Sequence, residues 1–106
     1  MDITTPRRSI VSDYGSHDAT VSAIARTTTT AHVHAIHITT GGELGEHVAP
    51  TDQILVALVG RAHVSTNGDS AVLNAGERIR WSAGDEHRTR ALEDFHGVII
   101  ESAGIA

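Results

Sequence analysis

Short apolar runs separated by glycine turns make up most of the chain beyond residue 20. Residues 21–40 are rich in valine, isoleucine and threonine, and they lack the apolar stripe at helical spacing that an amphipathic helix would show. Similar short runs follow at 54–59, 62–65, 71–73, 77–81 and 96–101. The turn Asn67-Gly68-Asp69 lies between two of these runs and is typical of a β-hairpin. This pattern predicts an all-β sandwich or barrel.

The run from Ile54 to Val59 is apolar at every position, which is typical of a strand that is covered on both faces. Successive side chains of a strand point to opposite faces, so one set faces the barrel: Gln53, Leu55, Ala57 and Val59. The other set, Ile54, Val56 and Leu58, needs cover outside the barrel. A second copy of the chain would supply this cover, so we expect a homodimer, and part of the N-terminal segment is the alternative source.

Residues 1–22 are polar and are interrupted by Pro6 and Gly15. We therefore expect an N-terminal arm or edge strand over residues 1–22 and a single barrel domain over residues 23–106. A chain of 106 residues has room for one small hydrophobic core.

The charge, the hydropathy and the absence of cysteine indicate which kinds of partner and metal site to expect. The net charge of −5 and the scattered arginines argue against nucleic acid, which needs clustered positive charge. No apolar run is long enough to span a bilayer, and the first residues lack the apolar stretch of a secretory signal, so we expect a cytoplasmic protein with no membrane partner. Because there is no cysteine, any metal would be held by histidine, carboxylate or amide groups.

Two glycine-framed blocks carry the candidate chemistry. In the first, Gly41 is followed after five residues by His47 and later by Gln53 and Gly60. In the second, Gly84 precedes His87 by three positions. No serine-nucleophile elbow or phosphate-binding loop is present in the sequence.

The order and spacing of these blocks resemble the two motifs of the cupin superfamily. The first motif runs Gly, five residues, His-x-His, three or four residues, Glu, six residues, Gly, and residues 41–60 reproduce its spacing. The second runs Gly, five residues, Pro-x-Gly, two residues, His, three residues, Asn, and residues 76–91 reproduce that spacing. The resemblance covers about half of the chain and implies a small single-domain cupin barrel, also called a jelly roll or double-stranded β-helix.

The resemblance also implies a metal site that this chain carries in altered form. Cupins with a metal usually bind it through two histidines and a glutamate of the first motif and one histidine of the second. His47 and His87 fall on two of those positions, whereas Ala49 replaces the other histidine and Gln53 replaces the glutamate. The set His47, Gln53 and His87 could hold a divalent zinc, nickel, iron, manganese or copper ion, or none at all.

Further residues are candidates for the same cavity. Trp81, the only tryptophan, could line it, although core packing is the simpler role. His34 would reach the space beside Ala49 if it points into the barrel, and the alternative is a solvated histidine at a strand edge. The same choice applies to His32 and His63.

Two hypotheses of function follow. The first is a small-molecule-binding cupin, a sensor or carrier with a weakened or absent metal site. The second is a metal-dependent cupin enzyme, a dioxygenase or an isomerase, that uses His47, Gln53 and His87. The loss of two strong ligands favours the first, and a fold that hosts many functions does not decide between them.

Overall fold

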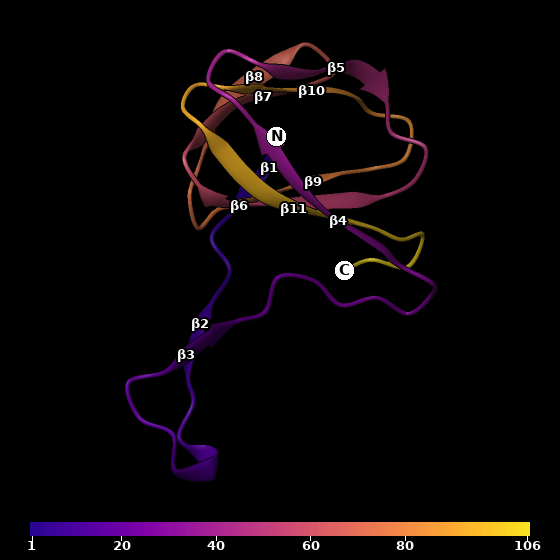
Figure 1. The fold of residues 1–106 in the computed structure, drawn as a ribbon. Helices are drawn as coiled ribbons and strands as arrows, with labels where there is room; N and C mark the ends of the chain where they lie inside the picture. The colour runs from indigo at the N-terminus through magenta and orange to yellow at the C-terminus, as the bar shows by residue number, and fades with distance from the viewer.

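Two antiparallel sheets face each other and form a barrel in the computed structural model, which describes all residues from 1 to 106 (Figure 1). The five-stranded sheet has the order β1 (Asp2–Thr4), β9 (Arg78–Trp81), β6 (Gln53–Val59), β11 (Phe95–Glu101), β4 (His32–Ile38). The four-stranded sheet has the order β5 (Glu43–Val48), β10 (Glu86–Ala91), β7 (Arg61–Thr66), β8 (Asp69–Asn74). The predicted all-β barrel is confirmed.

The core lies between the two sheets and is built from every second residue of the strands. Trp81 and Phe95 are its largest side chains, and both are fully buried together with Leu55, Leu73 and Ile79. Burial of a side chain of this size stabilises the fold by roughly 1.5–3 kcal/mol. The strands that carry these residues also carry the polar residues described below, so packing of the core sets the position of the site.

A β-bulge in β6 changes which side chains face the interior. Gly97 pairs with Ala57, but the preceding His96 pairs with Val59, so Leu58 is the extra residue. Beyond the bulge, Val59 lies on the outer face with His96 and is 56% exposed. The prediction that Val59 faces the barrel is therefore wrong, because the bulge reverses the alternation of side chains at this point.

The outer face of β6 is covered by the chain itself near Ile54 and Val56, which are only 2% and 4% exposed. Val56 lines an outer groove together with Pro6 from the N-terminal segment and Ile24, which follows that segment. Leu58 lines the same groove but stays 57% exposed. A single chain therefore buries Ile54 and Val56 on the outer face of β6 and leaves Leu58 exposed.

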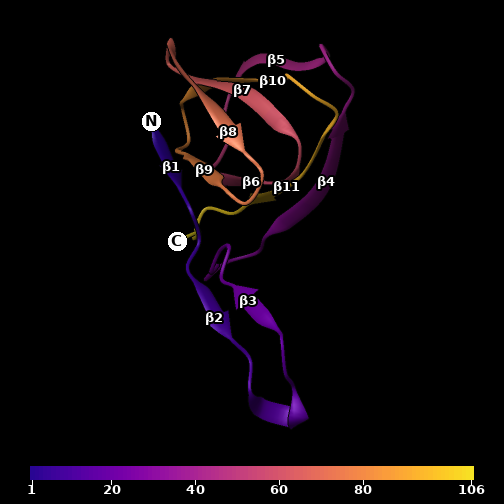
Figure 2. The ribbon, with the colours of Figure 1, turned by 90° about the vertical axis from the view of Figure 1, so that its left-hand side faces the viewer.

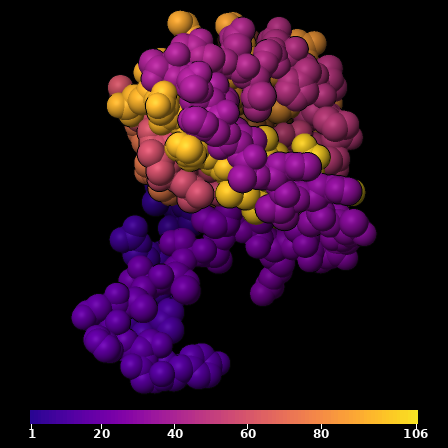
Figure 3. All heavy atoms as spheres, in the orientation of Figure 1, coloured from indigo at the N-terminus to yellow at the C-terminus, as the bar shows by residue number.

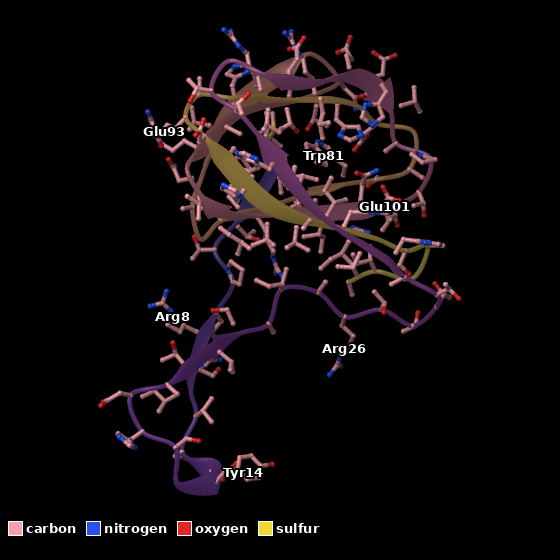
Figure 4. The ribbon with its side chains drawn as sticks, viewed as in Figure 1. Arg8, Tyr14, Arg26, Trp81, Glu93 and Glu101 are labelled. Atoms are coloured by element: carbon pink, nitrogen blue, oxygen red, sulfur yellow. The ribbon has the colours of Figure 1, made fainter.

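A narrow arm projects from the barrel (Figures 1–3). It consists of the hairpin β2 (Arg8–Ile10) and β3 (Thr20–Ser22), joined through the 3₁₀ turn η1 (Asp13–Gly15). Tyr14 lies at its tip, far from the barrel, and is 98% exposed (Figure 4). By contrast, β1 belongs to the barrel, where it pairs with β9. The structure has no helix with the length and apolar character needed to cross a bilayer.

Candidate functional site

The two motif histidines meet in the barrel because their strands are neighbours. His47 on β5 lies directly opposite His87 on β10 in the antiparallel register. Side chains opposite each other in such a pair share one face of the sheet, and here both line the same cavity, with His87 buried and His47 exposed. The ring centroids of His47 and His87 are 4.3 Å apart, with the rings tilted by 51°.

The turn before His87 is fixed by hydrogen bonds that link both motifs. The backbone N–H of Ala49 donates to the carbonyl of Asp85 at 2.8 Å, and the N–H of Gly84 donates to the carbonyl of Ala49 at 2.9 Å. The side chain of Asp85 accepts a hydrogen bond from the backbone N–H of Ser82 at 2.9 Å and another from the amide of Asn67 at 3.0 Å. Ala49, which is 1% exposed, therefore contributes backbone contacts where the cupin motif has a ligand.

His87 is a buried imidazole without a hydrogen-bond partner at either ring nitrogen. The residue is 4% exposed, and the ring of Trp81 lies against it at a centroid distance of 4.3 Å. Burial, and to a smaller extent nearby His47, lower the pKa of His87 to about 4, although Asp85 opposes the shift. His87 is therefore neutral at physiological pH and offers one donor and one acceptor.

His47 has a fixed orientation. Its Nδ1 lies 2.7 Å from the carbonyl oxygen of Gly45. Because a carbonyl can only accept, Nδ1 is protonated, and in the neutral form of the ring Nε2 keeps a free lone pair. A second polar acceptor is thus available beside His87.

A cavity of about 60 Å³ contains both histidines. Its apolar walls come from Leu44, Leu55, Trp81 and Ile99. Its polar groups come from His47, Gln53, His87, Thr89 and Glu101. This volume exceeds what a single water molecule needs, and a few polar groups on apolar walls are typical of small-molecule sites.

The structure brings four of the residues singled out from the sequence to this cavity: His47, Gln53, Trp81 and His87. His34 is exposed on β4, opposite Ile99, and is not part of the lining. Gln53 is buried, at 3% exposure. Trp81 belongs to the core and also lines the cavity, and its Nε1–H donates to Thr66 Oγ1 at 2.8 Å.

Glu101 and Thr89 were not identified from the sequence. Alternation along β11 would have indicated Glu101, because Phe95, Gly97 and Ile99 precede it at every second position and face inward. Thr89 follows His87 by two positions on β10 and shares its face for the same reason.

The residues of the cavity fit a metal ion only in part. His47 Nε2 and the unprotonated ring nitrogen of His87 are suitable metal ligands, and a neutral imidazole binds a metal without first losing a proton. The structure contains no group of three histidine, aspartate or glutamate side chains placed to hold one ion. Gln53 would have to supply the third ligand through its neutral amide oxygen.

No family model matches the sequence, and no curated protein matches it either. The fold, however, matches solved structures. A cupin superfamily protein from Desulfitobacterium hafniense superposes with a TM-score of 0.65 at 14% identity, over 73% of each chain. A salicylate 1,2-dioxygenase from Pseudoaminobacter salicylatoxidans gives 0.67 at 16% identity, over 70% of this chain and 21% of that enzyme.

A conserved protein of unknown function from Streptococcus pyogenes matches over a longer stretch. It superposes with a TM-score of 0.65 at 21% identity, over 95% of this chain and 93% of its own. The arm at residues 8–22 amounts to 15 of 106 residues, or 14%, so a match of this extent includes most of the arm. The chain is therefore a small all-β protein with the cupin fold.

Proposed function

We propose that this protein binds a small organic molecule in the barrel cavity and that His87 and His47 recognise the polar group of that ligand. The observation that carries the proposal is His87, whose two ring nitrogens are buried without partners. An unsatisfied buried polar group costs roughly 1–3 kcal/mol. A ligand that donates to the acceptor nitrogen of His87, or accepts from its N–H, would recover part of this free energy.

The neighbouring groups support binding in preference to a purely structural role for His87. Asp85 and Asn67 fix the turn before His87, and Gly45 fixes the ring of His47, so the site is preorganised without a ligand. A core histidine that only packs would be expected to bond to a nearby carbonyl or hydroxyl group.

The test is a fragment screen on metal-free protein, read by the fluorescence of Trp81. Trp81 is the only tryptophan and lines the cavity, so its emission reports occupancy directly. We expect cavity-binding fragments to change the emission of the wild type and to lose at least about tenfold in affinity in His87→Leu, which removes both hydrogen-bonding nitrogens. His63→Leu, a change at an exposed histidine of β7, is the matched control and should bind normally. A screen in which no fragment binds, or in which His87→Leu binds as well as the wild type, would refute the proposal.

A metal-dependent enzyme is the second candidate function, and the free Nε2 of His47 beside His87 favours it. His47, His87 and Gln53 would hold a divalent zinc, nickel, iron, manganese or copper ion. Such an ion would polarise an oxygen of a bound substrate. The similarity in fold to a salicylate dioxygenase supports this candidate only at the level of architecture.

Titration of metal-free protein with Ni²⁺ or Cu²⁺ tests the metal site. If the pair chelates an ion, Trp81 emission is quenched with a one-to-one end point, because Trp81 lies 4.3 Å from His87. We expect His47→Ala and His87→Ala each to weaken binding by about tenfold or more, whereas His63→Ala leaves it unchanged. Equal binding by wild type and His87→Ala would exclude the cavity as the metal site.

A further inference from the structure

Glu101 is the one carboxylate in the wall of the cavity, and the sheet register explains its position. It lies at the end of β11 (Figure 4). There it pairs with Gln53 of β6 on one side and with His32 of β4 on the other. Glu101 and Gln53 both line the cavity. The carboxylate is therefore part of the same interior row as Gln53 and Trp81, which are themselves paired across β6 and β9.

Glu101 forms no ion pair in the structure. The three ion pairs of the structure, Arg61–Glu93, Arg80–Asp52 and Arg88–Glu43, do not include it. His32, its neighbour across the strands, is exposed and forms no ion pair with it. No lysine or arginine lines the cavity. A half-buried carboxylate in such surroundings favours a cationic partner and repels anions.

The remaining polar groups of the cavity add no lysine or arginine that would offset the charge of Glu101. His87 is neutral, His47 in its neutral form presents an acceptor at Nε2, and Gln53 and Thr89 carry no charge. Metal-free, the cavity thus combines one negative charge with short apolar walls from Leu55 and Ile99. Carboxylates only accept hydrogen bonds, so the group that meets Glu101 must be a donor.

We propose that the ligand of this cavity is a small amine whose ammonium group is bound by Glu101 and whose hydrocarbon part lies against Leu55 and Ile99. This inference rests on the proposed small-molecule function and names its ligand class. Charge-assisted hydrogen bonds are roughly twice as strong as neutral ones, so the amine binds more tightly than the matching alcohol. A carboxylate of the same length is excluded by repulsion from Glu101.

Three probes of equal length test the inference on metal-free protein near neutral pH: propylammonium, 1-propanol and propionate. Binding is followed by Trp81 fluorescence and by NMR shifts of residues in the cavity. We expect the affinity to fall in that order, with propylammonium at least about tenfold tighter than propionate, which corresponds to 1.4 kcal/mol. Glu101→Gln should remove the preference for the cation while the folded NMR spectrum is retained.

Glu46→Gln is the matched control. It removes the same charge from β5 next to His47, but its side chain is exposed and by alternation points away from the interior. This variant should keep the preference for propylammonium. A preference lost equally in Glu46→Gln and Glu101→Gln would show that net charge alone is responsible and would overturn the inference.

Two further outcomes separate the inference from the function on which it rests. If propionate binds the wild type as tightly as propylammonium, or if other fragments occupy the cavity while none of the three probes does, the amine assignment is wrong and small-molecule binding stands. If no fragment of any kind binds, the proposed function itself fails.

Discussion

Replacing Gly60 by alanine lowers the free energy of unfolding by roughly 2–5 kcal/mol, because two costs add at this position. Gly60 has a φ of +81°, a conformation that costs L-residues about 1–2 kcal/mol. A Cβ at Gly60 would also lie 2.2 Å from the backbone carbonyl oxygen of Asp94. That carbonyl belongs to the turn before β11, which is held by the hydrogen bond from Thr40 N–H to the Asp94 carboxylate at 2.9 Å, so it has little freedom to move.

Gly41 supplies the control for Gly60, because it has the same backbone conformation without the close contact. Its φ is +82°, and a Cβ there would meet no atom within 4 Å. Gly41→Ala should therefore cost only about 1–2 kcal/mol. Urea denaturation followed by circular dichroism measures both variants, and equal losses in the two would show that contact with Asp94 does not constrain the β6–β7 connection.

Replacing His87 by leucine removes most of the acid sensitivity of the fold between about pH 6.5 and pH 4. Above the ordinary pKa of 6.5 the imidazole is neutral in both folded and unfolded chains, so it contributes no pH dependence. Below pH 6.5 His87 becomes protonated in the unfolded chain but stays neutral in the folded chain, because burial lowers its folded pKa to about 4. Stability therefore falls as the pH falls through this window, by about 3 kcal/mol in total.

At neutral pH, His87→Leu should lose ligand binding without losing stability. Leucine introduces no unsatisfied polar atom, so we expect His87→Leu to be within about 1 kcal/mol of the wild type near pH 7, or more stable. Denaturant unfolding across the pH range measures both effects, and His63→Leu should keep the wild-type pH dependence because His63 is exposed. A His87→Leu protein as acid-sensitive as the wild type would contradict the assignment of a neutral, buried His87.

The folded pKa of His87 also predicts how occupancy depends on pH. Between pH 7 and the folded pKa of about 4 the ring stays neutral and keeps its acceptor nitrogen. Protonation of His87 should therefore not weaken the binding of a ligand that donates to this nitrogen between pH 7 and about pH 4.

The sequence by itself determined the class of fold and the two central residues of the site. Short β-branched runs between glycine turns are sufficient to predict strands, since alternation and turn chemistry are local properties. The spacing of Gly41, His47, Gln53 and Gly60, and of Gly76, Gly84 and His87, pointed to the cupin barrel because each motif occupies one continuous stretch of chain.

The tertiary structure decided what surrounds those residues. The bulge at Leu58 turned Val59 outward, and the segments around Pro6 and Ile24 helped cover the outer face of β6. Glu101 joined the cavity because β11 pairs with β6 in one particular register. His87 became neutral and unpartnered through burial against Trp81 and His47. Each of these depends on contacts between residues far apart in the chain, and local patterns of polarity do not specify register between distant strands.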